Sequence, residues 1–373
     1  MNHIRKVLLV SKITGLENLK INLKTLDSSN INLRSTHYQK NLENLIKRHN
    51  EHQKFIHCIL ENIKLFNKEL KIVKKNDYDD NHANWADLIV SAGGDGTFLN
   101  ASSRVHNNEK LIVGINTDPS ASTGHLCLKN VKCSDIKEVL GQIFNNHFET
   151  INRARIRTLI CNPSWIKDFG HIKSLHSKKN IYSENIFSQA LQSDNGIRLN
   201  LKALNEVYAG ENSSAKVSQY EIKIDNEKSF ERQKSSGVIL YTGTGSSSWA
   251  NHVNRISSVS IREIVNIMRE LNLVDNTNQV EDEVIDKIRK KFNQSLIVPV
   301  DSTEIGFIIR DGVQNSKFKI TRDRGFGSKI SLISMMQDGF LAIDGAFGVP
   351  FNNGTKAEFS IHPEDSLKCI ANL

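Results

Sequence analysis

Short apolar runs recur along the first 150 residues, each followed by a polar or glycine-rich turn. Ile4–Val10, Leu88–Val90 and Leu111–Ile115 are apolar enough to form buried strands. Asn41–Phe66 has apolar residues at the i, i+3, i+4 spacing of an amphipathic helix, which could break near its middle. This alternation predicts a doubly wound, mainly parallel sheet, so that residues 1–150 form an α/β domain.

The other segments of this region complete the alternation. Lys71–Val73 is predicted to be a second strand, and helices are predicted at Tyr78–Trp85, Phe98–Val105 and Val131–Phe144. The polar stretch Lys20–Asn41 is rich in Asn and Ser and is predicted to be a loop.

The pattern changes near residue 150 to the period-two alternation of strands. Arg153–Ile160 alternates charged and apolar side chains. Further strands are predicted at Arg198–Tyr208, Tyr220–Ile224, Gly237–Tyr241, Glu304–Ile309, Lys317–Thr321, Lys329–Ser334 and Phe340–Ile343. Residues 162–196 are predicted to be a loop or insertion, and helices are predicted at Ile261–Leu273 and Val280–Phe292. Residues 151–350 are therefore predicted to form a β-rich domain with a helical insertion near 260–293.

Composition narrows the class of protein. The chain has 373 residues, enough for two domains, and no apolar stretch approaches the ~20 residues that cross a membrane. The net charge of +8 suits an anionic ligand, but no nucleic-acid-binding motif accompanies it. We therefore expect neither a membrane nor a nucleic-acid partner. The five cysteines show no metal-binding spacing, which favours a reducing compartment and argues against structural zinc.

The glycine-rich turn Gly93–Thr97 directly follows a predicted buried strand and precedes a predicted helix. A phosphate commonly meets backbone N–H groups at such a junction. Gly93, Gly94 and Gly96 let the backbone approach a ligand, and Asp95 is the one ionisable group on the turn. A tight turn without a ligand remains the alternative for these residues alone. The motif is neither a P-loop nor a dinucleotide-binding fingerprint.

Further polar clusters follow other strands. Asn116–Asp118 follows the strand at 111–115, and the adjacent pair Asn205 and Glu206 can contact one ligand only at a strand end. Thr242–Ser248 offers small residues and hydroxyls that can surround phosphates or a ribose. A polar edge strand and a flexible turn are the respective alternatives. Together the clusters favour one nucleotide site, with Asp95 as general base for phosphoryl transfer.

Taken in order, these motifs resemble the NAD kinase family, and they are more similar still to its mitochondrial branch. The segments that carry the resemblance are AGGDGTFLNASSRV, GINTDPSASTGHLCL, ALNEVYAGE, QKSSGVILYTGTGSSSW and IDGAFGVPFNNG, and it runs from about Val7 to the C-terminus. The resemblance implies an NAD kinase and diacylglycerol kinase-like fold, in which residues 351–373 return to the first domain. It also implies ATP-dependent phosphorylation of the 2′-hydroxyl on the adenosine ribose of NAD, which gives NADP.

The resemblance also implies roles for individual residues. Asp95 matches the catalytic aspartate that accepts the hydroxyl proton, and Asn205 and Glu206 match the pair that holds NAD. The other nucleotide-contacting residues that it implies are Gly93, Gly94, Gly96, Thr97, Asn116, Thr244, Gly245, Ser246, Ser247, Ser248 and Trp249. Mg²⁺ is implied by ATP chemistry. Asp118 and Asp344 are polar candidates near the site, but phosphates can hold the metal largely by themselves, so no protein ligand is assigned.

A homodimer is implied, and so is a location in the mitochondrial matrix, or in the cytoplasm if no transit peptide precedes the chain. Two positions depart from the common family pattern: Gly243 replaces a proline, as in the mitochondrial branch, and Ser236 stands where an aspartate often precedes Gly237. A lipid kinase of the diacylglycerol or sphingosine type would share only the glycine turn. A non-catalytic NAD(P)-binding protein on the same fold is a further alternative, against which Asp95 counts. The sequence leaves open whether ATP or polyphosphate is the donor and whether NADH is accepted.

Overall fold

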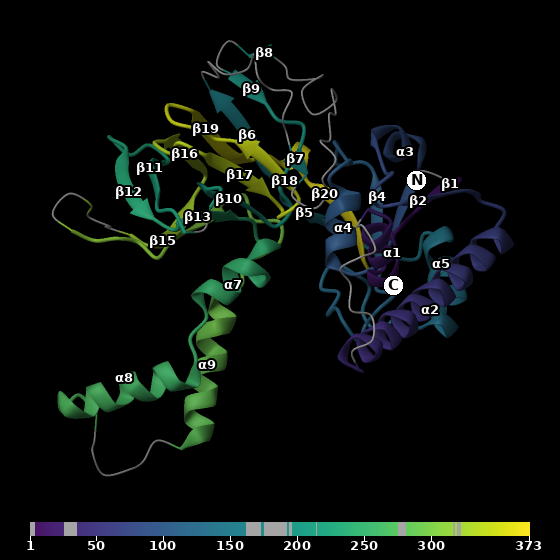
Figure 1. The fold of residues 1–373 in the computed structure, drawn as a ribbon, viewed down its shortest axis with the longest axis horizontal. Coiled ribbons are helices and arrows are strands. Elements are labelled where there is room, and N and C mark those ends of the chain that lie inside the picture. The colour runs from purple at the N-terminus through teal and green to yellow at the C-terminus, as the bar shows by residue number, and fades with distance from the viewer. Residues whose placement is uncertain are drawn as a thin grey trace. The chain divides into compact units, whose positions relative to one another are not determined.

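The computed structural model describes residues 4–25, 36–161, 173–174, 192–193, 196–213, 215–274, 281–315, 318 and 322–373. The chain divides into two units (Figure 1). The first comprises Met1–Asn152 with Ser366–Leu373, and the second comprises Arg153–Asp365. The segment that belongs to the first unit thus begins at Ser366, later than the 351 expected from the sequence, because β19 (Lys356–Ile361) pairs within a sheet of the second unit.

The first unit is built on a six-stranded sheet with the order β2-β1-β3-β4-β20-β5. β1 pairs in parallel with β2 on one side and β3 on the other, and β4 pairs in parallel with β3 and β20. The chain therefore winds outward in both directions from β1, which confirms the predicted doubly wound sheet. The elements are β1 (Lys6–Ser11), α1 (Gly15–Thr25), α2 (Thr36–Leu65), β2 (Glu69–Lys74), α3 (Asp80–Trp85), β3 (Leu88–Ala92), α4 (Asp95–Ser102), β4 (Leu111–Ile115), η2 (Cys133–Asp135), α5 (Ile136–Phe144), β5 (Glu149–Arg153) and β20 (Leu367–Asn372).

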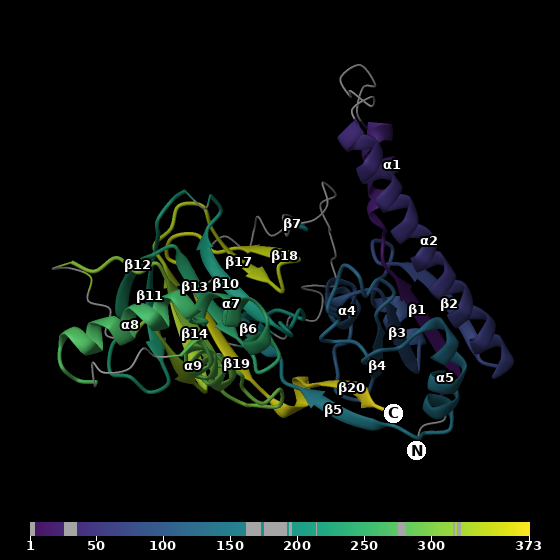
Figure 2. The same ribbon diagram turned by 90° about the horizontal axis from the view of Figure 1, so that it is seen from below.

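Helix α2 covers the sheet of the first unit with one apolar stripe. Ile56, Ile59 and Ile63 lie in the same buried cluster as Val7 of β1 and Val90 of β3. Their spacing places them on one side of the helix, and Figure 2 shows α2 running along the sheet with α5 beside it. This packing fixes the rotation of α2 about its own axis, and with it the side of the helix that is turned toward the ends of the strands.

One prediction for this region was wrong and another is confirmed. Lys20–Asn41 was predicted to be a loop, but α1 continues to Thr25 and α2 begins at Thr36; residues 26–35 lie outside the described residues. The helix predicted at 41–66 is confirmed as part of α2 and is continuous near its middle, where the buried His52 bonds to side chains at the strand ends.

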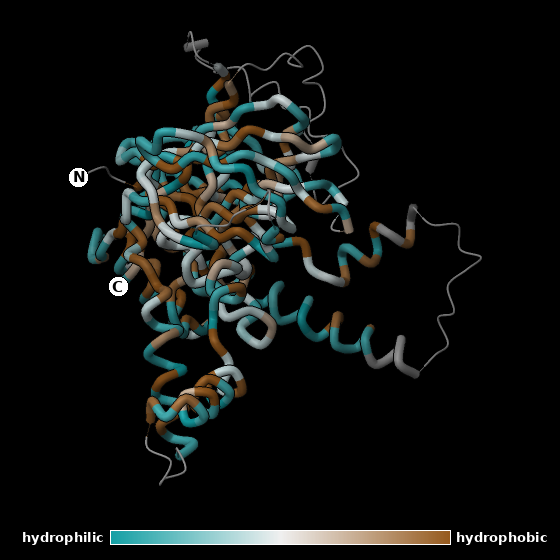
Figure 3. Tube along the Cα trace, turned by 90° about the vertical axis from the view of Figure 1, so that its left-hand side faces the viewer, coloured by the Kyte–Doolittle hydropathy of each residue, from teal (hydrophilic) through white to brown (hydrophobic). Residues whose placement is uncertain are grey.

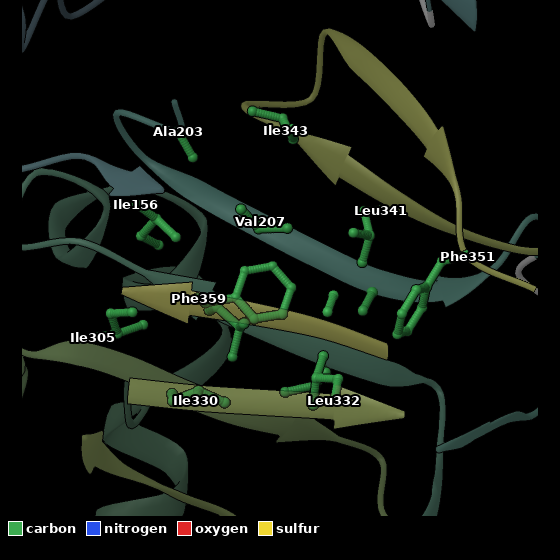
Figure 4. Close-up of a cluster of buried hydrophobic side chains, with 14 of the residues drawn as sticks. Ile156, Ala203, Val207, Ile305, Ile330, Leu332, Leu341, Ile343, Phe351 and Phe359 are labelled. Atoms are coloured by element: carbon green, nitrogen blue, oxygen red, sulfur yellow. The ribbon is translucent and has the colours of Figure 1, made fainter. Parts of the chain in front are cut away.

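The second unit contains two seven-stranded sheets, with the orders β15-β14-β13-β10-β17-β18-β7 and β12-β11-β16-β19-β6-β9-β8. Their inner faces pack on one another: Val207 and Leu341 of one sheet share a buried cluster with Leu332 and Phe359 of the other (Figure 4). The elements are β6 (Ile156–Cys161), β7 (Lys173–Ser174), β8 (Gln192–Ser193), β9 (Gly196–Arg198), β10 (Glu206–Glu211), β11 (Ser218–Ile224), β12 (Glu231–Ser235), β13 (Gly237–Tyr241), η4 (Gly245–Ser247), α7 (Trp249–Asn254), α8 (Ser258–Glu270), α9 (Asp282–Ser295), β14 (Ile305–Arg310), β15 (Arg324–Gly327), β16 (Lys329–Ser334), β17 (Gly339–Ile343), β18 (Phe347–Pro350), β19 and η5 (Pro363–Asp365).

The single strand predicted at Arg198–Tyr208 was wrong. The chain instead forms β9 and β10, and residues 199–205 between them belong to no strand. The strand predicted at Lys317–Thr321 lies outside the described residues except for Phe318. No strand was predicted beyond Ile343, where the structure has β18, β19 and β20.

The strands of both units carry buried apolar side chains, and Figure 3 colours the apolar stretches of the trace brown. In the second unit, α8 and α9 pack on each other and project from the sheets (Figure 1). They leave several apolar side chains exposed: Val259, Ile264, Ile267, Val284 and Ile288. Within the described ranges of the chain, no helix combines the length and the apolar character that crossing a membrane requires.

Candidate active site

The glycine turn of the first unit joins the fully buried strand β3 to helix α4. The backbone N–H of Gly93 donates to the carbonyl of Ile115 at 3.0 Å, which holds the turn against the end of β4. The helix begins at Asp95, three residues earlier than predicted, with Gly94 as its N-cap and no capping side chain. The first N–H groups of α4 are therefore available to an anionic ligand.

The three glycines of the turn have different roles. A Cβ on Gly93 would overlap the hydroxyl of Thr97, and a Cβ on Gly94 would overlap the hydroxyl of Ser122. A Cβ on Gly96 would meet nothing within 4 Å. Packing within the unit thus requires the first two glycines, while the open space at Gly96 can receive a ligand.

Asp95 is held in one orientation by the loop that follows β4. Its Oδ1 accepts the backbone N–H of Leu126 at 2.8 Å, and its Oδ2 accepts that of His125 at 3.1 Å. Each oxygen keeps a further lone pair that can accept a proton. Burial, together with the negative charge of Asp95, raises the pKa of the Cys127 thiol to about 12, so this neighbour stays protonated at neutral pH.

Asn116 shapes the same loop. Its amide nitrogen donates to the carbonyl of Ser122 at 2.8 Å, and its amide oxygen accepts the backbone N–H of Asp118 at 3.0 Å. Gly124 has φ +66°, and a Cβ there would press on the Asn116 amide. Asn116 therefore positions the loop that carries the two N–H donors to Asp95. Its contact with a nucleotide stays a prediction.

Asp118 is fully engaged by the protein. Its Oδ2 accepts from the Lys12 ammonium at 2.9 Å and from the Arg48 guanidinium at 2.8 and 3.0 Å, and its Oδ1 accepts from the hydroxyl of Ser120 at 3.0 Å. These donors outweigh the opposing effect of burial and lower the pKa of Asp118. A carboxylate with two cationic partners does not fit the role of a Mg²⁺ ligand.

In the second unit, Asn205 precedes β10 and Glu206 is its first residue. Both therefore lie at a strand end, which is the condition under which they can share a ligand. The carboxylate of Asp344 accepts the backbone N–H groups of Leu204, Asn205 and Glu206 at 2.8, 2.7 and 3.1 Å. Asp344 has φ +48°, a conformation that Asp tolerates better than most residues. Its oxygens hold the backbone of this turn, so it too does not fit the role of a Mg²⁺ ligand.

Glu206 carries the most unusual carboxyl group of the site. Its side chain is only 8% exposed, and its Oε2 has no hydrogen-bond partner among the described residues. Burial, followed by the nearby charge of Asp344, raises the pKa of Glu206 to about 8. A buried acceptor without a partner is rare in folded proteins, and it indicates a place where a ligand donates.

The segment after β13 packs directly on this turn. The backbone N–H of Thr242 donates to the carbonyl of Asn205 at 3.0 Å, and its hydroxyl donates to that of Leu204 at 2.5 Å. The amide of Asn205 donates to the Ser248 hydroxyl at 3.4 Å, and a Cβ on Gly245 would overlap the Asn205 carbonyl. The structure therefore brings together the predicted residues Asn205, Glu206, Thr244, Gly245, Ser246, Ser247, Ser248 and Trp249 within the second unit.

Sequence reasoning missed several neighbours of this segment. Arg153 donates to the Thr244 hydroxyl at 3.3 Å. The ring centroids of Tyr208 and Trp249 are 5.5 Å apart. The Cζ atom of the Arg310 guanidinium lies 5.3 Å from the ring centroid of the same Trp249. These residues come from β5, β10 and β14, so no local motif could have grouped them.

Comparison with known proteins identifies the family. Residues 18–148 match the family model of the ATP-NAD kinase N-terminal domain. The chain is 33% identical over 331 residues to the Rattus norvegicus protein named NAD kinase 2, mitochondrial, and the match covers 87% of this chain and 77% of the rat protein. The chain belongs to the NAD kinase family. The Homo sapiens protein of the same name is also 33% identical, over 332 residues, with 87% of this chain and 74% of the human protein covered.

Solved structures of NAD kinases share the fold. An NAD kinase from Archaeoglobus fulgidus, in complex with ATP, superposes with a TM-score of 0.54 at 15% identity, covering 98% of this chain and 94% of the archaeal one. Yeast NADH kinase, complexed with NADH, gives a TM-score of 0.53 at 14% identity, covering 100% and 85%. These likenesses confirm the predicted combination of an α/β unit with a β-rich unit.

Proposed function

We propose that this NAD kinase family member transfers the terminal phosphoryl group of ATP to the 2′-hydroxyl on the adenosine ribose of NAD, giving NADP. The observation that carries the proposal is the buried carboxyl group of Glu206, whose Oε2 has no partner beside the Asn205 turn. Ribose hydroxyls are donors of the kind that such an oxygen accepts. Family membership supplies the reaction to which this binding geometry belongs.

Asp95 is the proposed general base. Its carboxylate accepts the proton of the NAD 2′-hydroxyl as that oxygen forms a bond to the γ-phosphorus, and ADP leaves with the electrons of the broken P–O bond. The N–H groups of His125 and Leu126 fix the orientation of Asp95 before substrate arrives. The uncapped first turn of α4, with the open space at Gly96, is the proposed position of donor phosphate.

Mg²⁺ is proposed to enter as part of the ATP complex. The two carboxylates considered as ligands, Asp118 and Asp344, are occupied by protein donors. The described residues also contain no group of three or more His, Cys, Asp or Glu side chains arranged to hold a metal. Phosphate oxygens and water are then the natural ligands, as is common for Mg²⁺. No protein ligand is proposed.

A homodimer is part of the proposal. The exposed apolar side chains of α8 and α9 support it, with exposed fractions between 42% and 77%: Val259, Ile264, Ile267, Val284 and Ile288. Exposed apolar side chains on a projecting helical pair favour burial against a second copy. Light scattering after size exclusion should give twice the chain mass, and the double variant Ile264→Lys, Ile288→Lys should give the monomer mass.

A mitochondrial location is proposed because the relatives at 33% identity carry that location in their names. Fractionation of cells that express the natural full-length protein with a C-terminal tag tests this proposal. Tag signal in the mitochondrial fraction supports it, and signal confined to the cytosolic fraction would contradict it.

The decisive experiment is a coupled assay with NAD, ATP and Mg²⁺, in which an NADP-specific dehydrogenase reports the product. Wild-type protein should form NADP, and Asp95→Asn should lose activity by about 100-fold or more. Asp95→Asn should still gain thermal stability from NAD, because its Asn205 and Glu206 are unchanged. Asp301→Asn, at an exposed aspartate of the second unit, is the matched control.

Other outcomes select the alternatives. NAD binding without NADP formation would favour a non-catalytic binding protein. If neither occurs, diacylglycerol and sphingosine become the acceptors to test. Polyphosphate in place of ATP, and NADH in place of NAD, settle donor and acceptor preference in the same assay.

A further inference from the structure

An ion-paired cluster lies beside the glycine turn within the first unit. Lys12 follows β1 directly, and its backbone N–H donates to the carbonyl of Ala92, the last residue of β3, at 3.0 Å. Its Cβ lies 3.1 Å from the position that a Cβ on Gly93 would take. Ser122 fills the space that a Cβ on Gly94 would need. The root of the Lys12 side chain is therefore in contact with the turn.

The charges of this cluster do not cancel. One carboxylate, that of Asp118, faces two cations, since its Oδ2 accepts both from Lys12 and from Arg48. The sum of these three charges is one positive charge. Within the described residues, Asp118 is the only side-chain partner of the Lys12 ammonium, which has three N–H donors. Lys12 is 14% exposed, so the remaining donors can reach a bound anion.

Helix α2 holds both ends of the ion pair. The ring of His52 bonds to the hydroxyls of Ser11 at 3.0 Å and Thr117 at 2.8 Å. These are the residues immediately before Lys12 and Asp118. One turn earlier on α2, Arg48 bonds to the same Asp118 oxygen. The ends of β1 and β4 are thus locked at a fixed separation, so the ammonium needs little reorganisation when it binds.

We infer that Lys12 binds the phosphates of the nucleotide donor, and that Asp118, Arg48 and His52 are positioning residues that hold it there. The inference rests on the proposed function for the identity of the donor. A lysine ammonium is a compact point charge suited to the oxygens of a polyphosphate chain. The uncapped α4 N-terminus supplies backbone donors, and Lys12 supplies a positive charge, which the turn itself lacks because its one ionisable residue is Asp95.

Lys12→Gln tests the inference by removing the charge while keeping a polar side chain. The KM for ATP should rise about tenfold or more, the loss expected for one hydrogen bond to a charged group, while the KM for NAD stays within about twofold. Lys137→Gln, at an exposed lysine of α5 in the same unit, should change neither value. A merely structural role for the ion pair would lower thermal stability without separating the two KM values.

Direct binding keeps this test separate from that of the proposed function. In calorimetry, wild-type protein should bind Mg·ATP and inorganic tripolyphosphate, and Lys12→Gln should bind both about tenfold more weakly. This result would support the inference even if NAD were not the acceptor. Equal affinity of the two proteins for tripolyphosphate would overturn it.

If Lys12→Gln fails to fold, chemical footprinting of the wild-type protein tests whether Lys12 binds phosphate. Mass spectrometry can follow the reaction of each lysine with an amine-reactive ester. ATP and tripolyphosphate should slow labelling of Lys12 at least several-fold and leave that of Lys137 unchanged. Labelling of Lys12 at one rate with and without these phosphates would contradict the inference.

Discussion

Asp344 and Glu206 place two carboxyl groups at one turn, and the protein satisfies only one of them. The carboxylate of Asp344 accepts three backbone N–H groups, including that of Glu206 at 3.1 Å, whereas the Oε2 of Glu206 has no partner among the described residues. Asp344 thus fixes the backbone of the turn, and its charge helps to raise the pKa of the neighbouring Glu206. The carboxyl group of Asp344 builds the turn, and that of Glu206 is the one that we propose for ligand binding.

Asp344→Asn should weaken both the fold of this turn and the binding of NAD. Asn tolerates the φ of +48° found here, so the substitution tests the carboxylate and not the backbone conformation. Only one acceptor oxygen would remain for three N–H donors, which should cost about 1–3 kcal/mol of unfolding free energy. Thermal unfolding and the KM for NAD should both worsen, whereas Asp301→Asn should match wild type. An unchanged KM for NAD would contradict this role of Asp344.

Glu206→Gln should flatten the pH dependence of stability measured without nucleotides. The folded pKa of Glu206 is raised from 4.5 to about 8, so from pH 4.5 to pH 8 the folded state retains a proton that the unfolded chain has lost. Stability from this group is present below pH 4.5 and is lost as the pH rises through 8. The loss between pH 5 and pH 8 is about 3 kcal/mol.

Melting temperatures at pH 5 and pH 8 measure this effect. The advantage of Glu206→Gln over wild type should be larger at pH 8, while its KM for NAD should rise more than its KM for ATP. Glu304→Gln, at an exposed glutamate of the same unit, should follow wild type at both pH values. Identical pH profiles for Glu206→Gln and wild type would show that Glu206 is ionised in the folded protein.

Local chemistry made the main elements of the site predictable from sequence. The glycine turn needed only a buried strand, three glycines and a following helix, all within residues 88–102. The carboxyl ends of β4 and β13 could be placed in the same way, because the apolar run of each strand is continuous. Asn205 and Glu206 were found at a strand end even though the strand predicted around them was wrong at its start.

Long-range pairings could not be predicted in this way. Asp344 lies 138 residues from Glu206, and Asp118 lies 106 residues from Lys12, so no spacing or periodicity links them. The C-terminal strands were missed for another reason. β18 has only four residues, including a glycine and a proline, so the turn signals outweighed the strand pattern.

Gly96→Ala and Gly94→Ala should separate a ligand-binding role from a packing role. A Cβ on Gly96 meets no protein atom within 4 Å, so Gly96→Ala should melt within about 2 °C of wild type but lose ATP affinity. A Cβ on Gly94 would overlap the Ser122 hydroxyl, so Gly94→Ala should lower the melting temperature. Thermal unfolding and the KM for ATP measure both effects. A Gly96→Ala protein with wild-type ATP affinity would show that the space at Gly96 stays empty during the reaction.

His52 should make the protein acid-sensitive, because it is buried without charge between two hydroxyls. Burial, together with nearby Lys12, lowers its pKa from 6.5 to about 4. Between these values the unfolded chain binds a proton that the folded protein excludes, so stability from His52 is present above pH 6.5 and is lost as the pH falls through 4. At pH 5 the loss is about 2 kcal/mol.

His52→Gln should be less stable than wild type at pH 7, having lost a hydrogen bond to Ser11 or Thr117, but its melting temperature should fall less between pH 7 and pH 5. His147→Gln, at an exposed histidine of the same unit, should retain the full wild-type fall. An equal fall in His52→Gln and wild type would show that another group carries the acid sensitivity.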